Sequence, residues 1–166
     1  IENTEFETIN NISSIHAARK VMGTADCFIC EADLYISDLS IFDAELSRSC
    51  YYGKMVPGFS DDWVFDWDGE RITRVGKEGT DRYNMVGVSY FKKADAAVIR
   101  DAIDAAYEKP GYEGLYWDEI VDRQLDKLNL DIHPVEKEQI VEIDSVAELA
   151  VIDESYREVL EKMQAE

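Results

Sequence analysis

The stretch Cys27-Phe28-Ile29-Cys30-Glu31-Ala32-Asp33 decides the fold, because four apolar residues run directly into two acids. A short apolar run of this kind predicts a strand that is buried on both faces of a sheet. In α/β proteins, ligands bind beyond the carboxyl ends of such strands, and Glu31 and Asp33 stand at such an end. Asp33 is therefore a candidate ligand for a divalent metal, with a helix cap or a solvated turn as the alternative.

Helices and strands alternate along the rest of the chain. We expect helices at 8–22, 38–47, 94–107 and 116–128, and a last amphipathic helix with its apolar stripe at Leu149, Ile152, Tyr156, Leu160 and Met163. We expect further strands at 50–52, 64–67, 71–75, 84–91, 133–135 and 139–143. Asp68-Gly69 between two of them is a strong hairpin signal. This order predicts one α/β domain over residues 1–166, with a mixed central sheet and a β-hairpin insertion.

The composition restricts the partners. The chain has 17 Lys and Arg against 36 Asp and Glu, a formal net charge of −19. Nucleic acid is excluded as a partner, because binding its backbone needs a basic surface. A nucleoside triphosphate would also be repelled, so a nucleotide substrate requires a divalent metal or basic groups from elsewhere.

The same sequence argues for a cytoplasmic protein. It has no run of about 18 apolar residues that would span a membrane, and no leader peptide at its start. Three cysteines, an odd number, argue for a reducing compartment. Cys27 and Cys30 are interpreted as core thiols, because strand alternation turns them to opposite faces and no second pair is present for zinc.

Aromatic residues stand beside acids at two places. Tyr116-Trp117-Asp118 puts two rings next to a carboxylate, and Asp62-Trp63 repeats the combination. Ring faces with a counter-charge bind organic cations such as quaternary ammonium groups, at about 0.5 to 2 kcal/mol per contact. The alternative for each tryptophan is core packing, which is the commoner role.

A second acid resembles Asp33 in its setting. Asp144 follows the strand expected at 139–143 and precedes a helix, so it is a candidate for a metal ligand or for a helix N-cap. The two histidines, His16 and His133, suggest no catalytic triad or dyad.

Taken in order, these motifs resemble bacterial CTP:phosphocholine cytidylyltransferases of the sugar-nucleotidyltransferase superfamily. The resemblance runs from about Asn3 to Leu149, and its motifs are Asn10-Asn11-Ile12-Ser13-Ser14, Glu31-Ala32-Asp33-Leu34-Tyr35, Asp62-Trp63, Gly87-Val88-Ser89-Tyr90-Phe91, Leu115-Tyr116-Trp117-Asp118 and Glu142-Ile143-Asp144-Ser145-Val146. It implies a Rossmann-like nucleotidyltransferase fold. The implied reaction is Mg²⁺-dependent transfer of the cytidylyl group from CTP to phosphocholine, giving CDP-choline and pyrophosphate for cell-surface polysaccharide biosynthesis.

The resemblance also implies roles for single residues. The catalytic and metal-binding residues would be Asp33 and Asp144. The residues lining the choline pocket would be Asp62, Trp63, Tyr116, Trp117 and Asp118, and those near the nucleotide Asn11 and Ser14. The partners would be the two small-molecule substrates, with no nucleic acid and no membrane; the sequence predicts no oligomeric state.

The sequence departs from the family pattern in three ways. Glu31 replaces the usual first aspartate of the metal motif, and Leu34 stands where a polar residue often follows. The family's glycine-rich loop, which grips the triphosphate, has no counterpart, so we expect the chain to form the C-terminal two-thirds of the family fold and to be inactive alone. The alternatives are an enzyme for another acceptor, such as phosphoethanolamine or a sugar phosphate, and a non-catalytic acidic binding domain of the same fold.

Overall fold

The computed structural model describes residues 1–164 and is built around a four-stranded sheet in the order β1-β4-β3-β5. The strands are β1 (Cys27–Cys30), β3 (Cys50–Trp67), β4 (Ile72–Phe91) and β5 (Asp131–Pro134). β1 and β3 run antiparallel to β4, whereas β5 runs parallel to β3. The predicted mixed sheet in an α/β fold is therefore confirmed. Two short strands, β2 (Leu34–Ile36) and β6 (Ile140–Glu142), pair antiparallel as a separate ribbon.

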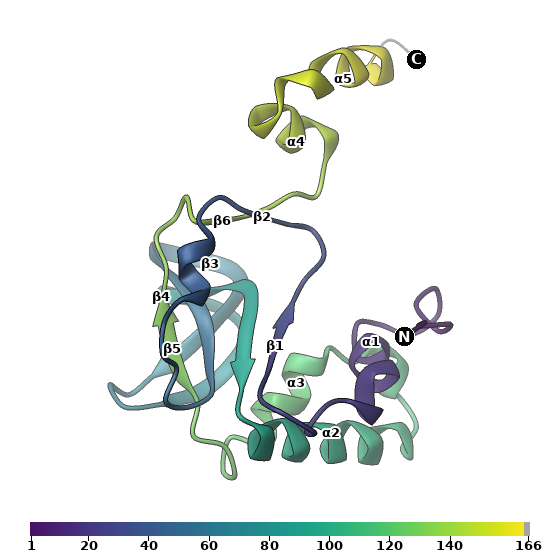
Figure 1. Cartoon of the computed structure of the whole chain (residues 1–166), viewed down its shortest axis with the longest axis vertical. Coiled ribbons are helices and arrows are strands. Elements are labelled where there is room, and N and C mark those ends of the chain that lie inside the picture. Colours follow the sequence, from purple (N-terminus) through teal and green to yellow (C-terminus); the bar gives the residue numbers. More distant parts are fainter. Residues whose placement is uncertain (165–166) are drawn as a thin grey trace.

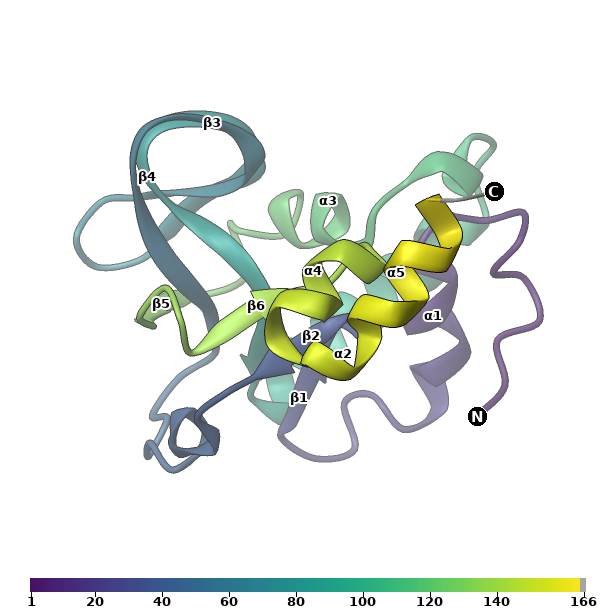
Figure 2. The ribbon, with the colours of Figure 1, turned by 90° about the horizontal axis from the view of Figure 1, so that it is seen from above.

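The hairpin of β3 and β4 dominates the sheet. Its turn forms where the sequence predicts it: Gly69 has φ +101°, and the Asp68 carboxylate accepts the backbone N–H groups of Glu70 and Arg71. The hairpin is longer than predicted, because β3 continues without a break from 50–52 to 64–67. It is bulged, so that Val64 pairs with both Gly76 and Asn84. Figure 2 shows how strongly β3 and β4 curl.

Helices cover one face of this sheet. They are α1 (Ile12–Ala17), which continues as the 3₁₀ turn η1 (Ala18–Lys20), then α2 (Lys93–Tyr107) and α3 (Trp117–Asp122), which is preceded by η3 (Tyr112–Gly114). The helix α2 forms because its apolar residues recur every three to four positions, and this stripe is buried: Ala96, Ile99, Ile103 and Ala106. Neighbouring Tyr51 and Tyr52 of β3 belong to separate core clusters, as expected for side chains that alternate across a strand.

Several predicted elements differ from the structure. The helix expected at 38–47 is only a 3₁₀ turn, η2 (Leu39–Phe42), and the helices expected at 8–22 and 116–128 are shorter than predicted. The last helix is broken into α4 (Val146–Ile152), η4 (Glu154–Tyr156) and α5 (Arg157–Gln164). The break occurs because Asp153 is extended and its carboxylate accepts the N–H of Ser155, which starts a new helical turn.

The two C-terminal helices lie apart from the helices that cover the sheet. Figure 1 shows α4 and α5 at the far end from α2, joined to the sheet through β6.

Cys27 is half-buried, but Cys30 is exposed, so the prediction of a core thiol is wrong for Cys30. None of the helices within residues 1–164 combines the length and apolar character needed to cross a bilayer.

Candidate active site

A cavity of about 500 Å³ opens where β1 ends, between β4 and the start of α3. All the sequence-predicted site residues except Asp144 line it: Asn11, Ser14, Asp33, Asp62, Trp63, Tyr116, Trp117 and Asp118. Glu31 and Glu142 line it as well. A larger hollow of about 690 Å³ between α2 and α3 contains none of the predicted residues and is not the candidate site.

Three acids converge on one side of this cavity. The carboxylate oxygens of Glu31, Asp33 and Glu142 lie within 4.8 Å of one another. The Glu31 N–H donates to the Gly87 carbonyl (2.9 Å), which ties this acid to β4, and the Asp33 carbonyl accepts the N–H of Ile143 (2.8 Å), which ties β2 to β6. We call Glu31, Asp33 and Glu142 the acid triad.

A glycine leaves space for the acid triad. Gly87 has φ +73°, and a Cβ atom at this position would lie 2.7 Å from Oε2 of Glu31 and 3.0 Å from the side chain of Leu34. Since both the backbone conformation and the space exclude a larger residue, Gly87 allows the Glu31 carboxylate to turn into the cavity.

The electrostatics of the acid triad favour a bound cation. Burial, followed by repulsion from Asp33 and Glu142, raises the pKa of Glu31. Burial, followed by repulsion from Asp144 and Asp33, also raises the pKa of Glu142, although Lys54 opposes this. Carboxylate oxygens are the ligands that Mg²⁺ prefers. The acid triad therefore fits a divalent cation, which would relieve the repulsion between its members.

Asp144 stands beside this group rather than in it. Its N–H donates to the Glu148 carboxylate (2.9 Å), and the N-cap of α4 is the neighbouring Ser145, whose hydroxyl accepts the N–H of Glu148 (3.2 Å). The alternative prediction, in which Asp144 itself is the N-cap of the helix, is therefore wrong. Sequence reasoning did not assign Glu142, two positions before Asp144 in the same motif. A metal held by Asp33 and Asp144 stays a prediction.

The aromatic residues divide into two pairs. The rings of Trp63 and Tyr116 meet edge to face, with centroids 5.4 Å apart and an interplanar angle of 64°. Trp117 is only 5% exposed, stacks on Tyr51 and meets the edge of Phe91, so most of its surface is core packing. Trp63 and Tyr116 are thus the rings with faces open to a ligand.

Asp118 forms a buried back wall of the cavity. Its carboxylate accepts a hydrogen bond from the Tyr51 hydroxyl (2.8 Å). Burial, followed by the nearby charge of Glu31, raises the pKa of Asp118 to about 7 despite this hydrogen bond. Asp118 can therefore change charge near neutral pH.

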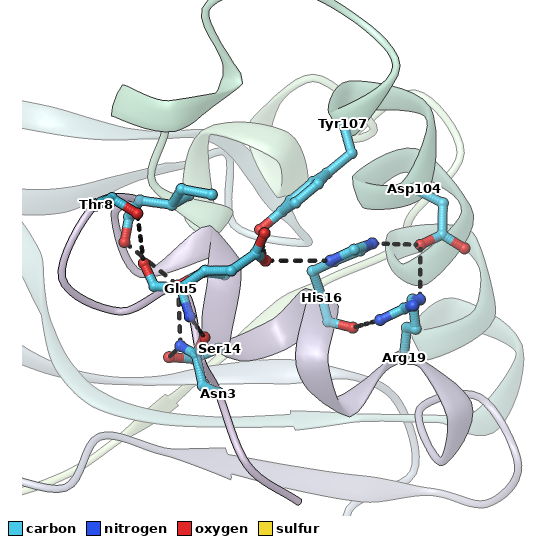
Figure 3. Close-up of polar contacts among 10 residues, drawn as sticks. Asn3, Glu5, Thr8, Ser14, His16, Arg19, Asp104 and Tyr107 are labelled. Atoms are coloured by element: carbon cyan, nitrogen blue, oxygen red, sulfur yellow. Dashed lines mark hydrogen bonds and ion pairs between the residues drawn. The ribbon is translucent and has the colours of Figure 1, made fainter.

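The residues predicted to lie near the nucleotide have partners in the fold. The Asn11 amide oxygen accepts the N–H of Trp117 (3.0 Å), which fixes the start of α3. The Ser14 hydroxyl accepts a hydrogen bond from Asn3 (3.2 Å; Figure 3). Figure 3 also shows His16 between Glu5 and Asp104, and its ring stacks on Tyr107 at 3.6 Å. His16 thus connects α1 to α2 and the N-terminal segment, away from the acid triad.

A basic group that sequence reasoning missed lies behind the ring pair. The Lys77 ammonium nitrogen is 5.8 Å from the centroid of the Trp63 ring and 5.2 Å from that of Tyr116. A second hollow, of about 570 Å³, lies on this side and is lined by Arg74, Lys77 and Arg123 as well as by the two rings. Lys77 pairs with Trp63 across the hairpin, a register that the bulged strands hide from sequence inspection.

Comparison with known proteins relates this arrangement to a known reaction class. No family model matches the chain. The chain is 51% identical over 157 residues to 2-aminoethylphosphonate cytidylyltransferase of Lancefieldella rimae, which covers 94% of the chain and 64% of that protein. It is 25% identical over 153 residues to choline-phosphate cytidylyltransferase of Streptococcus pneumoniae, covering 92% of the chain and 66% of the relative. The chain thus spans slightly less than two-thirds of the length of these relatives.

A solved structure supports the same fold. The CTP:phosphocholine cytidylyltransferase of Streptococcus pneumoniae superimposes with a TM-score of 0.79 at 24% identity, over 93% of this chain and 67% of that one. The Rossmann-like nucleotidyltransferase fold that the sequence predicts is therefore confirmed.

Proposed function

Because this chain is homologous to bacterial cytidylyltransferases and has the nucleotidyltransferase fold, we propose that it serves the transfer of a cytidylyl group from CTP. The acceptor would carry an anionic phosphorus group and an ammonium group. The observation that supports this is the cavity itself, in which the acid triad and the ring pair Trp63–Tyr116 line the same hollow. One end suits a metal that meets phosphate oxygens, and the other suits an organic cation.

The proposed reaction needs no nucleophile from the protein. An oxygen of the acceptor's phosphate or phosphonate attacks the α-phosphorus of CTP, a new P–O bond forms, and the bond to the β-phosphate breaks to release pyrophosphate. Glu31, Asp33 and Glu142 would hold Mg²⁺, which when bound neutralises charge on the phosphates. Asp144, close enough to raise the pKa of Glu142, would add to the negative field.

The chain's other residues would position the acceptor. The carboxylates of Asp62 and Asp118 line the cavity beside the rings and would attract the ammonium group. Trp63 and Tyr116 would cover its apolar part. Holding the acceptor in line with the nucleotide lowers the entropic part of the barrier.

We propose 2-aminoethylphosphonate as the leading acceptor and phosphocholine as the second. The relative that is 51% identical carries the first name, and the relative that is 25% identical carries the second. The geometry favours the first, because Trp117 lies in the core and the cavity holds more carboxylates than open ring faces. A primary ammonium can donate three hydrogen bonds to such carboxylates. A sugar phosphate is less suited, since Asn11 and Ser14 are the only amide and aliphatic hydroxyl side chains among the described residues that line the cavity.

The test is calorimetric titration of 2-aminoethylphosphonate and of phosphocholine into the protein, with and without Mg²⁺. We expect Mg²⁺-dependent binding of 2-aminoethylphosphonate that becomes about two- to threefold weaker in Trp63→Leu, because a primary ammonium relies mainly on the carboxylates and loses one cation–π contact. Trp67→Leu is the matched control, because Trp67 is exposed on the hairpin and donates to Asp131 outside the cavity. Binding of neither acceptor would overturn the proposal and favour a non-catalytic domain of this fold.

A second experiment addresses the transfer itself. The protein is incubated with CTP, Mg²⁺ and acceptor, and the CDP-linked product is followed by ³¹P NMR. Product formation would support the proposed function.

A further inference from the structure

Lys77 has an unusual environment for a lysine in a chain of net charge −19. Its ammonium lies over two aromatic rings, and across residues 1–164 it takes part in no ion pair. Two acids line the hollow of about 570 Å³ that contains Lys77, but both have other partners. Glu119 accepts the N–H of Tyr116 (2.8 Å), and Asp122 accepts the N–H of Val75 (2.8 Å). The two rings are therefore the main partners of the Lys77 charge.

The ring pair Trp63–Tyr116 lies between two hollows. We call the cavity lined by the acid triad the acidic cavity, and the hollow lined by Arg74, Lys77 and Arg123 the basic hollow. Trp63 and Tyr116 line both, whereas Lys77 lines only the basic hollow. Lys77 therefore approaches the rings from the side turned away from the acid triad. A cation in the acidic cavity would meet the same two rings from the opposite side.

This arrangement leaves few ring faces for a substrate. Because Trp63 and Tyr116 meet edge to face, the edge of one ring covers part of a face of the other. Lys77 lies on the outer side of the rings, and its positive charge opposes a second cation that binds the same π-systems from the cavity side. Trp117 adds little open surface, since it stacks in the core.

The loss of ring surface affects two kinds of ammonium differently. A quaternary ammonium has no N–H group and depends on ring faces for specific contacts. A primary ammonium donates charge-assisted hydrogen bonds to carboxylates and depends on rings much less.

We propose that Lys77 determines the amine selectivity of the acceptor site: by occupying the outer side of the Trp63–Tyr116 pair, it disfavours quaternary ammonium groups and so favours a primary amine. This inference rests on the proposed function for the identity of the acceptor. The placement of Lys77 against the rings does not depend on that function.

The experiment compares two ligands in three variants. The ligands are 2-aminoethylphosphonate and its N,N,N-trimethyl derivative, titrated with Mg²⁺ present. In Lys77→Met, which keeps the length of the side chain but removes the charge, we expect the trimethyl compound to bind about three- to tenfold more tightly. The primary amine should change by less than about twofold, because its hydrogen bonds to carboxylates remain. Lys77→Arg keeps the charge and should retain the wild-type ratio of the two dissociation constants.

Lys137→Met controls for the change in net charge. Lys137 is exposed between β5 and β6 and lines neither the acidic cavity nor the basic hollow. It should leave the ratio unchanged. An unchanged ratio in Lys77→Met, or equal weakening of both ligands, would show that Lys77 only holds the rings in place and would overturn the proposal.

A separate measurement distinguishes this inference from the proposed function. If the wild type binds neither phosphonate, the proposed function fails, and tetramethylammonium then serves as the probe. Its binding is followed by tryptophan fluorescence in a Trp67→Leu background, so that the signal comes from Trp63 and Trp117. Tighter binding after Lys77→Met supports the role of Lys77, and unchanged binding contradicts it.

Discussion

The acidic cavity and the basic hollow are both lined by Trp63 and Tyr116, but their charged groups differ in whether the fold provides partners for them. In the basic hollow, the cations have partners within the fold: Arg74 pairs with Asp66 (3.5 Å), Arg123 with Glu119 (4.0 Å), and Lys77 lies over the rings. In the acidic cavity, the members of the acid triad repel one another, and burial together with this repulsion raises the pKa of Glu31. The fold thus provides partners for the cations of the basic hollow, whereas the carboxylates of the acid triad would be stabilised by a bound cation. Strained or unpaired charge of this kind is typical of functional sites.

The largest expected effect comes from the buried wall of the acidic side. The pKa of Asp118, about 7 in the folded state, is above the usual value of 3.8. Below pH 4 the carboxyl is protonated in both states, so its contribution to stability is fully present there. As pH rises from 4 to 7, the unfolded chain ionises while the folded protein keeps its proton, and stability is lost. Between pH 5 and 8 this amounts to about 3 kcal/mol.

Asp118→Asn removes this dependence and keeps an oxygen for the Tyr51 hydroxyl. We expect the stability of Asp118→Asn relative to wild type to rise by about 3 kcal/mol from pH 5 to pH 8, as measured by urea unfolding. Asp61→Asn, an exposed change nearby, should show no such difference. Parallel pH profiles for wild type and Asp118→Asn would mean that the Asp118 carboxyl titrates normally.

The second effect tests which acids hold the metal. Asp33→Asn and Glu142→Gln should each weaken Mg²⁺ binding at least about tenfold, because each removes one oxygen ligand from the acid triad. Asp144→Asn should have a smaller effect, since Asp144 only adds to the negative field around Glu142. The measurement is the rise in melting temperature with added Mg²⁺.

The result for Asp144→Asn decides between two ligand sets. An effect as large as that of Asp33→Asn would assign a ligand to Asp144 and support the pair that the sequence predicts. Without Mg²⁺, Glu142→Gln should be at least as stable as wild type, because one repelling charge is gone. Destabilisation of the metal-free variant would contradict the repulsion inferred from the raised pKa of Glu142.

The parts of the fold with a strong local pattern could be predicted from the sequence. The apolar run of β1, the Asp68-Gly69 turn and the buried stripe of α2 all lie where expected. The prediction that β1 is buried on both faces is wrong, because β1 is an edge strand in which Phe28 and Cys30 are exposed. The continuity of β3 could not be predicted, because Gly53, Pro57 and Gly58 are residues that usually end a strand. There the pairing with β4 overrides local preference, and the bulges accommodate the breakers.

The candidate site was foreseen as a set of residues but not as an arrangement. Motifs far apart in sequence line one cavity, and the roles that the resemblance implies for them stay predictions. The division between buried Trp117 and half-buried Trp63 depends on how α3 packs against β4, which no local pattern contains. The position of Lys77 opposite Trp63 likewise follows from the register of a bulged hairpin.

The smallest expected effect lies on the basic side, at the bulge of β4 that follows Lys77. Glu78 has φ +66°, a left-handed conformation that costs a residue with a side chain about 1 kcal/mol. Arg74 donates to the backbone carbonyl of Glu78 (3.3 Å), so a change of the side chain leaves this contact in place. Glu78→Gly should therefore raise the free energy of unfolding by about 0.5 kcal/mol, after the greater chain entropy of glycine is subtracted. Glu70→Gly, in the turn of the hairpin and without a positive φ, should lower it. If Glu78→Gly destabilised the protein, the Glu78 carboxylate would have to stabilise the cations of the basic hollow. The contacts described above for Arg74, Lys77 and Arg123 would then not be the only ones that compensate their charges.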